Sequence, residues 1–165
     1  MAFGFLARST VLCCLLASGC SADLQEHARP VDTDVAAMRQ LADEWRAAAR
    51  AGAVDEYMNL LTADVVMLVP LQPVMTGQEA VRAFVQSFFS EYRISAETWQ
   101  SDEIVAAGEW AYDRGTYSAT YVPSASTASF LDVGTYLIIA RRQPGGSWKY
   151  ARLIWNVTSS TWPRF

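Results

Sequence analysis

The sequence predicts an α+β domain in which three N-terminal helices pack on a curved, mostly antiparallel sheet that forms a cone. Apolar residues recur at three- and four-residue spacing through much of the first half of the chain, which is typical of amphipathic helices. In the second half, apolar and polar residues alternate as they do in half-buried strands. An apolar fraction of 52% is high enough for a single packed core.

Three segments carry the helical signal. The first helix can be capped by Thr33 or Asp34, and Gly52 is predicted to end it. A short second helix is expected over about residues 55–61, with its own first residue, an aspartate, as the cap. The third is expected over residues 76–89, where a Thr and a Glu three positions apart have the spacing of a capping box.

Strands are predicted by alternation and by the turns between them. One strand precedes the third helix and four follow it. Glycine- and proline-containing turns, and a small-residue loop at 123–129, separate the last four. The predicted strands cover about residues 65–69, 95–105, 110–122, 130–142 and 148–158.

The first residues resemble a bacterial lipoprotein signal peptide. Arg8 provides a positive charge, an apolar run at 11–16 is too short to span a bilayer, and small residues precede Cys20. The resemblance implies cleavage before Cys20, diacylglyceryl attachment to its thiol and anchoring at the cell envelope. Ser21 rather than Asp follows, which favours the outer membrane if the host has two. An ordinary secretory signal with an incidental cysteine is the alternative.

The chain then divides into a signal peptide at 1–19, the lipidated Cys and a flexible tether at 20–33, a domain at 34–159 and a tail at 160–165. All three cysteines lie within the first twenty residues, so the domain is expected to hold neither a disulfide nor a thiolate zinc site. The single histidine, His27, lies in the tether, which excludes histidine-based catalysis from the domain. We expect no metal and no cofactor.

The charge pattern argues against nucleic acid as a partner. The chain has a net charge of −4, which becomes −5 when Arg8 leaves with the signal, and no basic run is present.

Four local phrases point to a family. They occupy residues 45–52, 61–66, 77–81 and 145–149, the last followed by Ile154-Trp155-Asn156. In this order they resemble the SnoaL-like, ketosteroid-isomerase-like branch of the nuclear-transport-factor-two-like (cystatin-like cone) superfamily. The resemblance covers most of the predicted domain and implies a cone-shaped fold with a ligand cavity.

The isomerase chemistry of that branch is not expected here. There, a helix Tyr and a protonated Asp bind an oxyanion, and a second Asp moves the proton. The matching phrases carry these positions onto Trp45, Ile138 and Val69, in that order. Valine and isoleucine can neither take up nor donate a proton, so the standard acids are missing.

The resemblance and strand alternation together predict which residues face the cone. Either these side chains fill the core or they enclose a ligand-sized cavity. Arg114 is expected to pair with Asp132 or Asp113, or else to receive a ligand oxygen. If the domain is catalytic, the candidates are Asp132, Arg114 and Tyr136. The predicted ligand-binding set is Trp45, Met67, Val69, Tyr112, Arg114, Tyr136, Ile138, Leu153 and Trp155.

Three functions remain open. The favoured one is an anchored module that binds a small apolar or amphipathic molecule. The second is a SnoaL-type isomerase, cyclase or dehydratase with non-standard catalytic residues. The third is an interaction protein that uses the outer face of the sheet. That face is expected to be apolar and to form a homodimer; its predicted residues are Tyr117, Tyr121, Leu131, Val133 and Leu137.

Overall fold

The computed structural model describes Met1 and residues 31–162. The predicted signal peptide, Cys20 and His27 lie outside the described residues. Among the helices of residues 31–162, none is long and apolar enough to cross a membrane.

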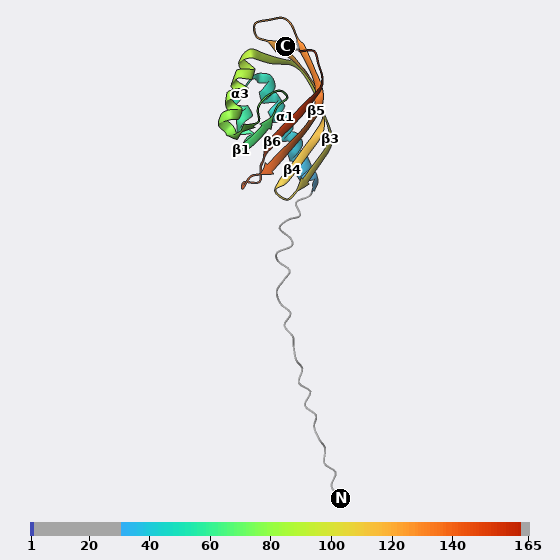
Figure 1. Ribbon diagram of the computed structural model, residues 1–165. Helices are drawn as coiled ribbons and strands as arrows, with labels where there is room; N and C mark the ends of the chain where they lie inside the picture. Colours follow the sequence, from blue (N-terminus) through green and yellow to red (C-terminus); the bar gives the residue numbers. More distant parts are fainter. Residues whose placement is uncertain (2–30, 163–165) are drawn as a thin grey trace.

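The predicted α+β class is confirmed, and the described elements follow the expected order along the chain (Figure 1). The first and second long strands begin three to four residues before their predicted starts, and one two-residue strand was not predicted. The helices are α1 (Val31–Ala51), α2 (Val54–Asn59) and α3 (Gly77–Glu91). The strands are β1 (Leu61–Leu68), β2 (Met75–Thr76), β3 (Tyr92–Ala107), β4 (Trp110–Pro123), β5 (Phe130–Arg142) and β6 (Trp148–Ser160).

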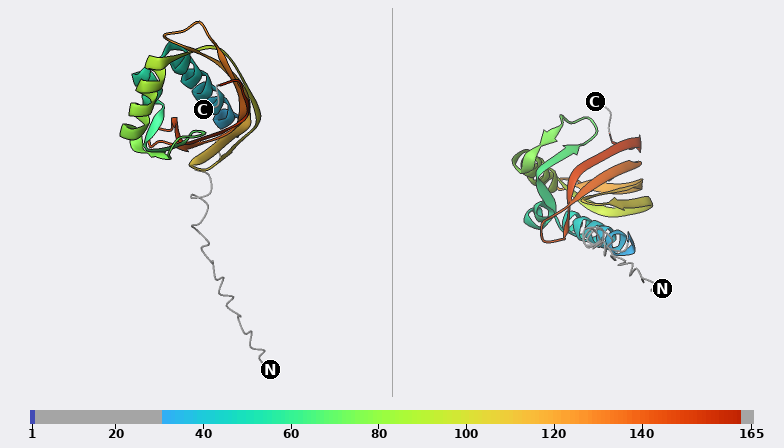
Figure 2. Two further views of the ribbon diagram at one scale, coloured as in Figure 1. Left: turned by 45° about the horizontal axis from the view of Figure 1, so that its top comes forward. Right: turned by 90° about the horizontal axis from the view of Figure 1, so that it is seen from below.

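One six-stranded sheet forms the body of the fold, in the order β2-β1-β6-β5-β4-β3. Strands β3 to β6 are antiparallel neighbours, whereas β1 pairs with β6 in parallel. The long strands curve, and the helices lie on the concave side of the sheet (Figure 2). The interior between helices and sheet is therefore the place to look for a site.

Two glycines accompany the curvature. At Gly115 and Gly134 the backbone of the next strand approaches so closely that a Cβ would lie 1.9 Å from a carbonyl oxygen, of Gln100 and Asn156 in that order. A register shift lies next to each glycine, in the β3–β4 and β5–β6 pairings. Glycine and bulges together let a strand bend sharply, so these positions shape the concave face.

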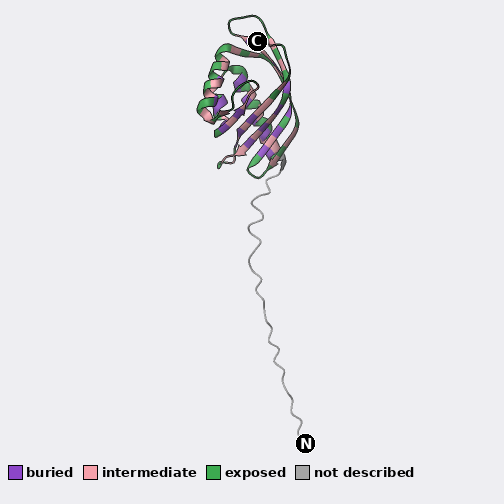
Figure 3. Ribbon diagram, viewed as in Figure 1, coloured by how far each residue is buried: buried purple, intermediate pink, exposed green. Residues whose placement is uncertain are grey.

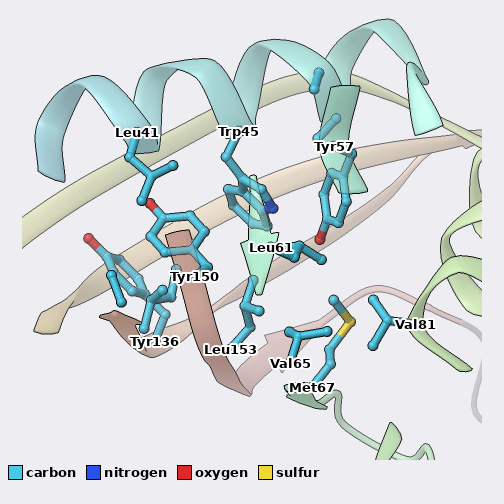
Figure 4. Packing of buried hydrophobic residues seen from close by; sticks show 14 of the residues in the cluster. Leu41, Trp45, Tyr57, Leu61, Val65, Met67, Val81, Tyr136, Tyr150 and Leu153 are labelled. Atoms are coloured by element: carbon cyan, nitrogen blue, oxygen red, sulfur yellow. The ribbon is translucent and has the colours of Figure 1, made fainter. Parts of the chain in front are cut away.

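The core joins the inner stripe of α1 to the concave face of the sheet. Buried positions recur along α1 and the strands where the two layers meet (Figure 3). Trp45 projects from α1 between Tyr57 and Tyr150, with ring centroids 5.4 and 5.9 Å away (Figure 4). Leu61 and Leu153, both fully buried, lie beneath these rings. The predicted apolar stripe of the first helix is thus the face that packs.

Helix starts differ from the prediction. Helix α1 begins at Val31, so Asp34 lies in its first turn, where it forms an ion pair with Arg142 at 2.5 Å. The expected capping box of α3 is wrong, because Thr76 makes no side-chain cap hydrogen bond. The expected cap of α2 by Asp55 is also wrong. Ala53 stands at that position.

Asp55 instead pairs with Arg82 on α3, at 2.6 Å. It therefore links two helices rather than closing the end of one. At the other end of α1, Gly52 has a φ of +65°, the left-handed conformation that ends helices readily. The predicted stop of the first helix is confirmed.

Candidate functional site

A cavity of about 150 Å³ lies between the helices and the concave face of the sheet. Its wall is mainly aromatic and is supplied by all three helices and by strands β3 to β6. Several wall residues, among them Phe88, Trp155 and Trp162, are only half-buried, so the cavity is partly open to solvent. The aromatic wall residues are Trp45, Tyr57, Phe84, Phe88, Phe89, Trp99, Tyr117, Tyr121, Trp155 and Trp162.

The rings are held by contacts with one another. On the α1 side, Trp45 meets Trp99 edge-on at 5.5 Å, and Trp99 stacks on Tyr117 at 5.0 Å. Such offset and edge-to-face pairs stabilise beyond their buried area. This side of the cavity is thus a connected aromatic surface rather than a set of independent side chains.

A second group of rings includes the half-buried Phe88 and Trp162. Phe88 of α3 meets Tyr121 edge-on at 5.5 Å, and Tyr121 lies 5.8 Å from Trp162. Trp162 in turn stacks on Phe130 at 4.8 Å. Trp162, two residues beyond the end of β6, is thereby part of the cavity wall, although the sequence assigned it to a tail.

Glu97 is one of two carboxylates in the wall. Its side chain is 5% exposed, and it accepts hydrogen bonds from Arg50 Nη1 at 2.6 Å and from Trp99 Nε1 at 2.8 Å. A buried carboxylate needs such partners because an isolated buried charge is costly. Glu97 therefore has a structural role. Its ion pair with Arg50 connects α1 to β3, and its hydrogen bond with Trp99 holds the indole in place.

Asp132 is the other carboxylate in the wall, as its predicted place at the rim requires. It is half-buried and accepts a hydrogen bond from Ser160 Oγ at 2.5 Å. Among the ion pairs of the described residues, none includes Asp132. Its negative charge in the wall has no basic partner in that part of the chain.

A third acid is buried deeper and does not reach the cavity. Asp113 on β4 is 5% exposed, and its Oδ1 accepts hydrogen bonds from Ser101 Oγ at 2.5 Å and from Tyr136 OH at 3.2 Å. Burial raises the pKa of the Asp113 carboxyl, and the two hydroxyls oppose that effect only in part. Sequence reasoning did not select this cluster.

The raised pKa predicts how Asp113 affects stability. A carboxyl with a raised pKa holds its proton more tightly when folded, so its contribution is full below the unfolded pKa, about 3.9, and is lost as the pH rises through the folded pKa. Asp113→Asn should therefore gain stability relative to the wild type between pH 3.5 and pH 7, measured by urea unfolding. A constant difference between the two proteins would contradict this.

The predicted ligand-binding set divides into three groups. Trp45, Val69 and Trp155 line the cavity. Met67, Tyr136, Ile138 and Leu153 face inward as expected but are packed into the core away from it. Both alternatives raised for the interior are thus partly realised: most of it is filled, and a cavity remains at one end.

The third group, Tyr112 and Arg114, is a correction. Both lie on the outer face of the sheet, because Asp113 pairs with Ile138 and shares its inward side. Arg114 is 53% exposed and binds Glu103 at 2.8 Å, with Asp102 at 3.9 Å. The expected pairing with Asp132 or Asp113, and the expected contact of Arg114 with a ligand in the cone, are therefore wrong.

Because the inward and outward faces of β4 are exchanged relative to the prediction, two tyrosines of this strand lie inside. Tyr117 and Tyr121 were expected on the outer face, but both line the cavity. A signal was present in the sequence: Ala111, Gly115 and Ala119 recur every fourth residue, so small residues share one face of the strand, and a glycine within a strand often marks the close approach of another backbone. Alternation along β3 put Glu97 and Trp99 on the same face of the strand. It did not indicate whether that face pointed inward or outward.

The described residues contain no group of three or more His, Cys, Asp or Glu side chains that could hold a metal ion. The arrangement can enclose a small molecule in aromatic surroundings and can present one carboxylate to it.

Comparisons with known proteins agree with this fold. The sequence model of one family, described as a SnoaL-like domain, matches residues 42–148. Among curated proteins, none matches the chain.

Several solved structures are similar. A ketosteroid isomerase-like protein from Erwinia carotovora atroseptica has a TM-score of 0.70 at 20% identity, covering 76% of this chain and 97% of its own. A conserved protein from Planctomyces limnophilus has a TM-score of 0.68 at 26% identity, covering 76% and 99%. A putative scytalone dehydratase from Novosphingobium aromaticivorans has a TM-score of 0.67 at 14% identity, covering 78% and 87%.

Proposed function

Because the chain belongs to the SnoaL-like domain family, we propose that its cavity binds a small, mainly apolar molecule and that a lipid on Cys20 holds the domain at the bacterial cell envelope. The aromatic cavity carries this proposal. Aromatic and apolar walls with a few polar groups are the usual composition of small-molecule sites.

The size of the cavity limits the ligand. A dry apolar cavity of about 150 Å³ is known to accept benzene, and the cavity here has the same volume. We therefore propose a ligand, or a ligand portion, of about one ring. A polycyclic molecule would need the half-buried side chains at the opening to move.

Replacing Trp155 by aspartate tests the proposal. The new carboxylate would lie in the apolar wall, where an unpaired charge is costly, so affinity for a one-ring hydrocarbon such as toluene should fall at least about tenfold. Titration calorimetry on the chain carrying Cys20→Ser measures this. Trp110→Asp, at an exposed position of β4, is the matched control and should bind like the parent.

Equal toluene affinity in the Trp155→Asp and Trp110→Asp proteins would reject the cavity as the binding site. Circular dichroism of both variants separates loss of binding from loss of fold. Native mass spectrometry of protein from its own envelope then identifies the natural ligand by the mass released on denaturation.

An enzymatic function is the second candidate, favoured by the Asp132 carboxylate in the cavity wall. Proteins of similar fold include putative dehydratases from Novosphingobium aromaticivorans and Streptomyces avermitilis. In this version Asp132 moves a proton of the bound molecule. Turnover of the identified ligand should then be lost in Asp132→Asn and kept in Arg114→Gln, whose side chain lies on the outer face. Equal turnover in both would reject Asp132 as the catalytic acid.

The proposal also includes a homodimer through the outer face of the sheet. Leu131 and Val133 are 39% and 36% exposed there, although Tyr117 and Tyr121 no longer contribute to this face. A monomer in light scattering at micromolar concentration would reject it.

A further inference from the structure

We propose that the cavity selects an organic cation: a small molecule whose ammonium group faces Asp132 while its alkyl or ring body packs against the aromatic wall. This inference rests on the proposed function, since it names the chemical class of the ligand for the same cavity.

The charges in the wall are of one sign. The only charged residues among the cavity's wall residues, all within the described part of the chain, are Glu97 and Asp132. Glu97 is neutralised by Arg50, which it binds at 2.6 Å. Asp132 has no ion-pair partner among the described residues, and its hydrogen-bond donor is the neutral hydroxyl of Ser160. A ligand in the cavity therefore meets one uncompensated negative charge.

The register of the sheet places that charge between two rings. Asp132 lies opposite Ala119, so Tyr117 and Tyr121 are its diagonal neighbours on the same face of β4. The carboxylate acts on both phenols: burial is the main cause of their raised pKa values, about 12 for Tyr117, and the charge of Asp132 adds to it. Asp132 thus contributes to the field inside the aromatic part of the cavity.

The rings themselves favour a cation. The face of an aromatic ring is negative, and an ammonium within about 6 Å of a ring centroid is attracted to it, most strongly by tryptophan. Trp99 stacks on Tyr117, and Trp162 lies 5.8 Å from Tyr121, so each tyrosine beside Asp132 is joined to an indole. A neutral ligand would gain the apolar contacts but neither the ring attraction nor the ion pair.

A charge-matched pair of probes tests this. Choline has as many non-hydrogen atoms as toluene, and replacing its quaternary nitrogen by carbon gives a neutral alcohol of the same shape. We expect the Cys20→Ser chain to bind choline at least about tenfold more tightly than the neutral isostere in titration calorimetry. The preference should shrink as salt is raised, because the opening exposes the ion pair to screening.

Asp132→Asn should abolish the preference by lowering the affinity for choline to that for the neutral isostere, since it removes the charge and keeps the size of the side chain. Asp102→Asn, which removes an exposed carboxylate on β3, is the matched control and should keep the preference. A preference that persists in Asp132→Asn, or that is lost equally in Asp102→Asn, would overturn the inference.

The outcomes separate this inference from the proposed function. Equal affinity for choline and its isostere in the parent protein overturns the cation and leaves an apolar cavity that binds. A protein that binds toluene but does not bind choline likewise overturns the cation and leaves an apolar cavity that binds. Failure of choline, the isostere and toluene alike overturns both.

Discussion

Alanine at position 134 is expected to lower the free energy of unfolding by about 3 kcal/mol, at the upper end of the range for overpacked sites. The added Cβ would lie 1.9 Å from the Asn156 carbonyl oxygen and 2.9 Å from Cε1 of Tyr117. The first of these atoms belongs to the neighbouring strand, so relief requires β5 and β6 to separate. Urea unfolding of the variant and the parent measures the loss.

Gly145→Ala is the matched control. Gly145 lies in the β5–β6 turn, where an added Cβ meets nothing within 4 Å, so stability should change by less than about 0.5 kcal/mol. If the two alanine variants were equally stable, close strand approach at Gly134 would not be a determinant of the curved sheet. Gly134→Ala also tests the site, because Tyr117 must move from the cavity wall to make room for the added Cβ.

Truncating Trp45 to alanine is expected to cost about 4 kcal/mol, as is usual for buried tryptophan. Trp45 is 6% exposed and touches Tyr57, Trp99 and Tyr150 through ring contacts of 5.4 to 5.9 Å. Its removal leaves a void beside the existing cavity, which adds to the lost transfer energy. Thermal and urea unfolding report the loss, and the enlarged cavity should admit a larger hydrocarbon than toluene.

Trp110→Ala provides the comparison. Trp110 is 42% exposed on β4, and the guanidinium carbon of Arg141 lies 5.6 Å from the centroid of its ring. An exposed cation–π contact contributes about 0.5–1 kcal/mol, so the loss should be several times smaller than at Trp45. Equal losses at the two positions would contradict the central place of Trp45 in the core.

Patterns within single segments predicted most of the fold. The bounds of β5 were predicted to the residue, and the stop of α1 at Gly52 was predicted by the need for a left-handed residue. Alternation, with the family resemblance to indicate which face is the inner one, also placed Tyr136 and Ile138 on the inward face of β5 and Leu153 on that of β6, as their burial confirms. The bounds of β5 and the stop of α1 depend on neighbours along the chain, so local propensity is enough to determine them.

The inward face of β4 depended on pairing between strands. A strand has a period of two, so a shift of one residue exchanges its faces, which put Arg114 outside and Asp113 inside. The six-residue loop at 124–129 between β4 and β5 does not fix the register as a tight hairpin would. A register shift after Ser101 in β3 removes a second guide.

The candidate site shows the same division. The sequence by itself determined the family resemblance, the apolar character of the interior and the place of Asp132 beside the cavity. Only the tertiary structure decided that Arg50 neutralises Glu97 and that two tyrosines flank Asp132. The physical reason is that charge balance and ring contacts join residues far apart in sequence, whose distances are set by strand register and by the packing of α1 on the sheet.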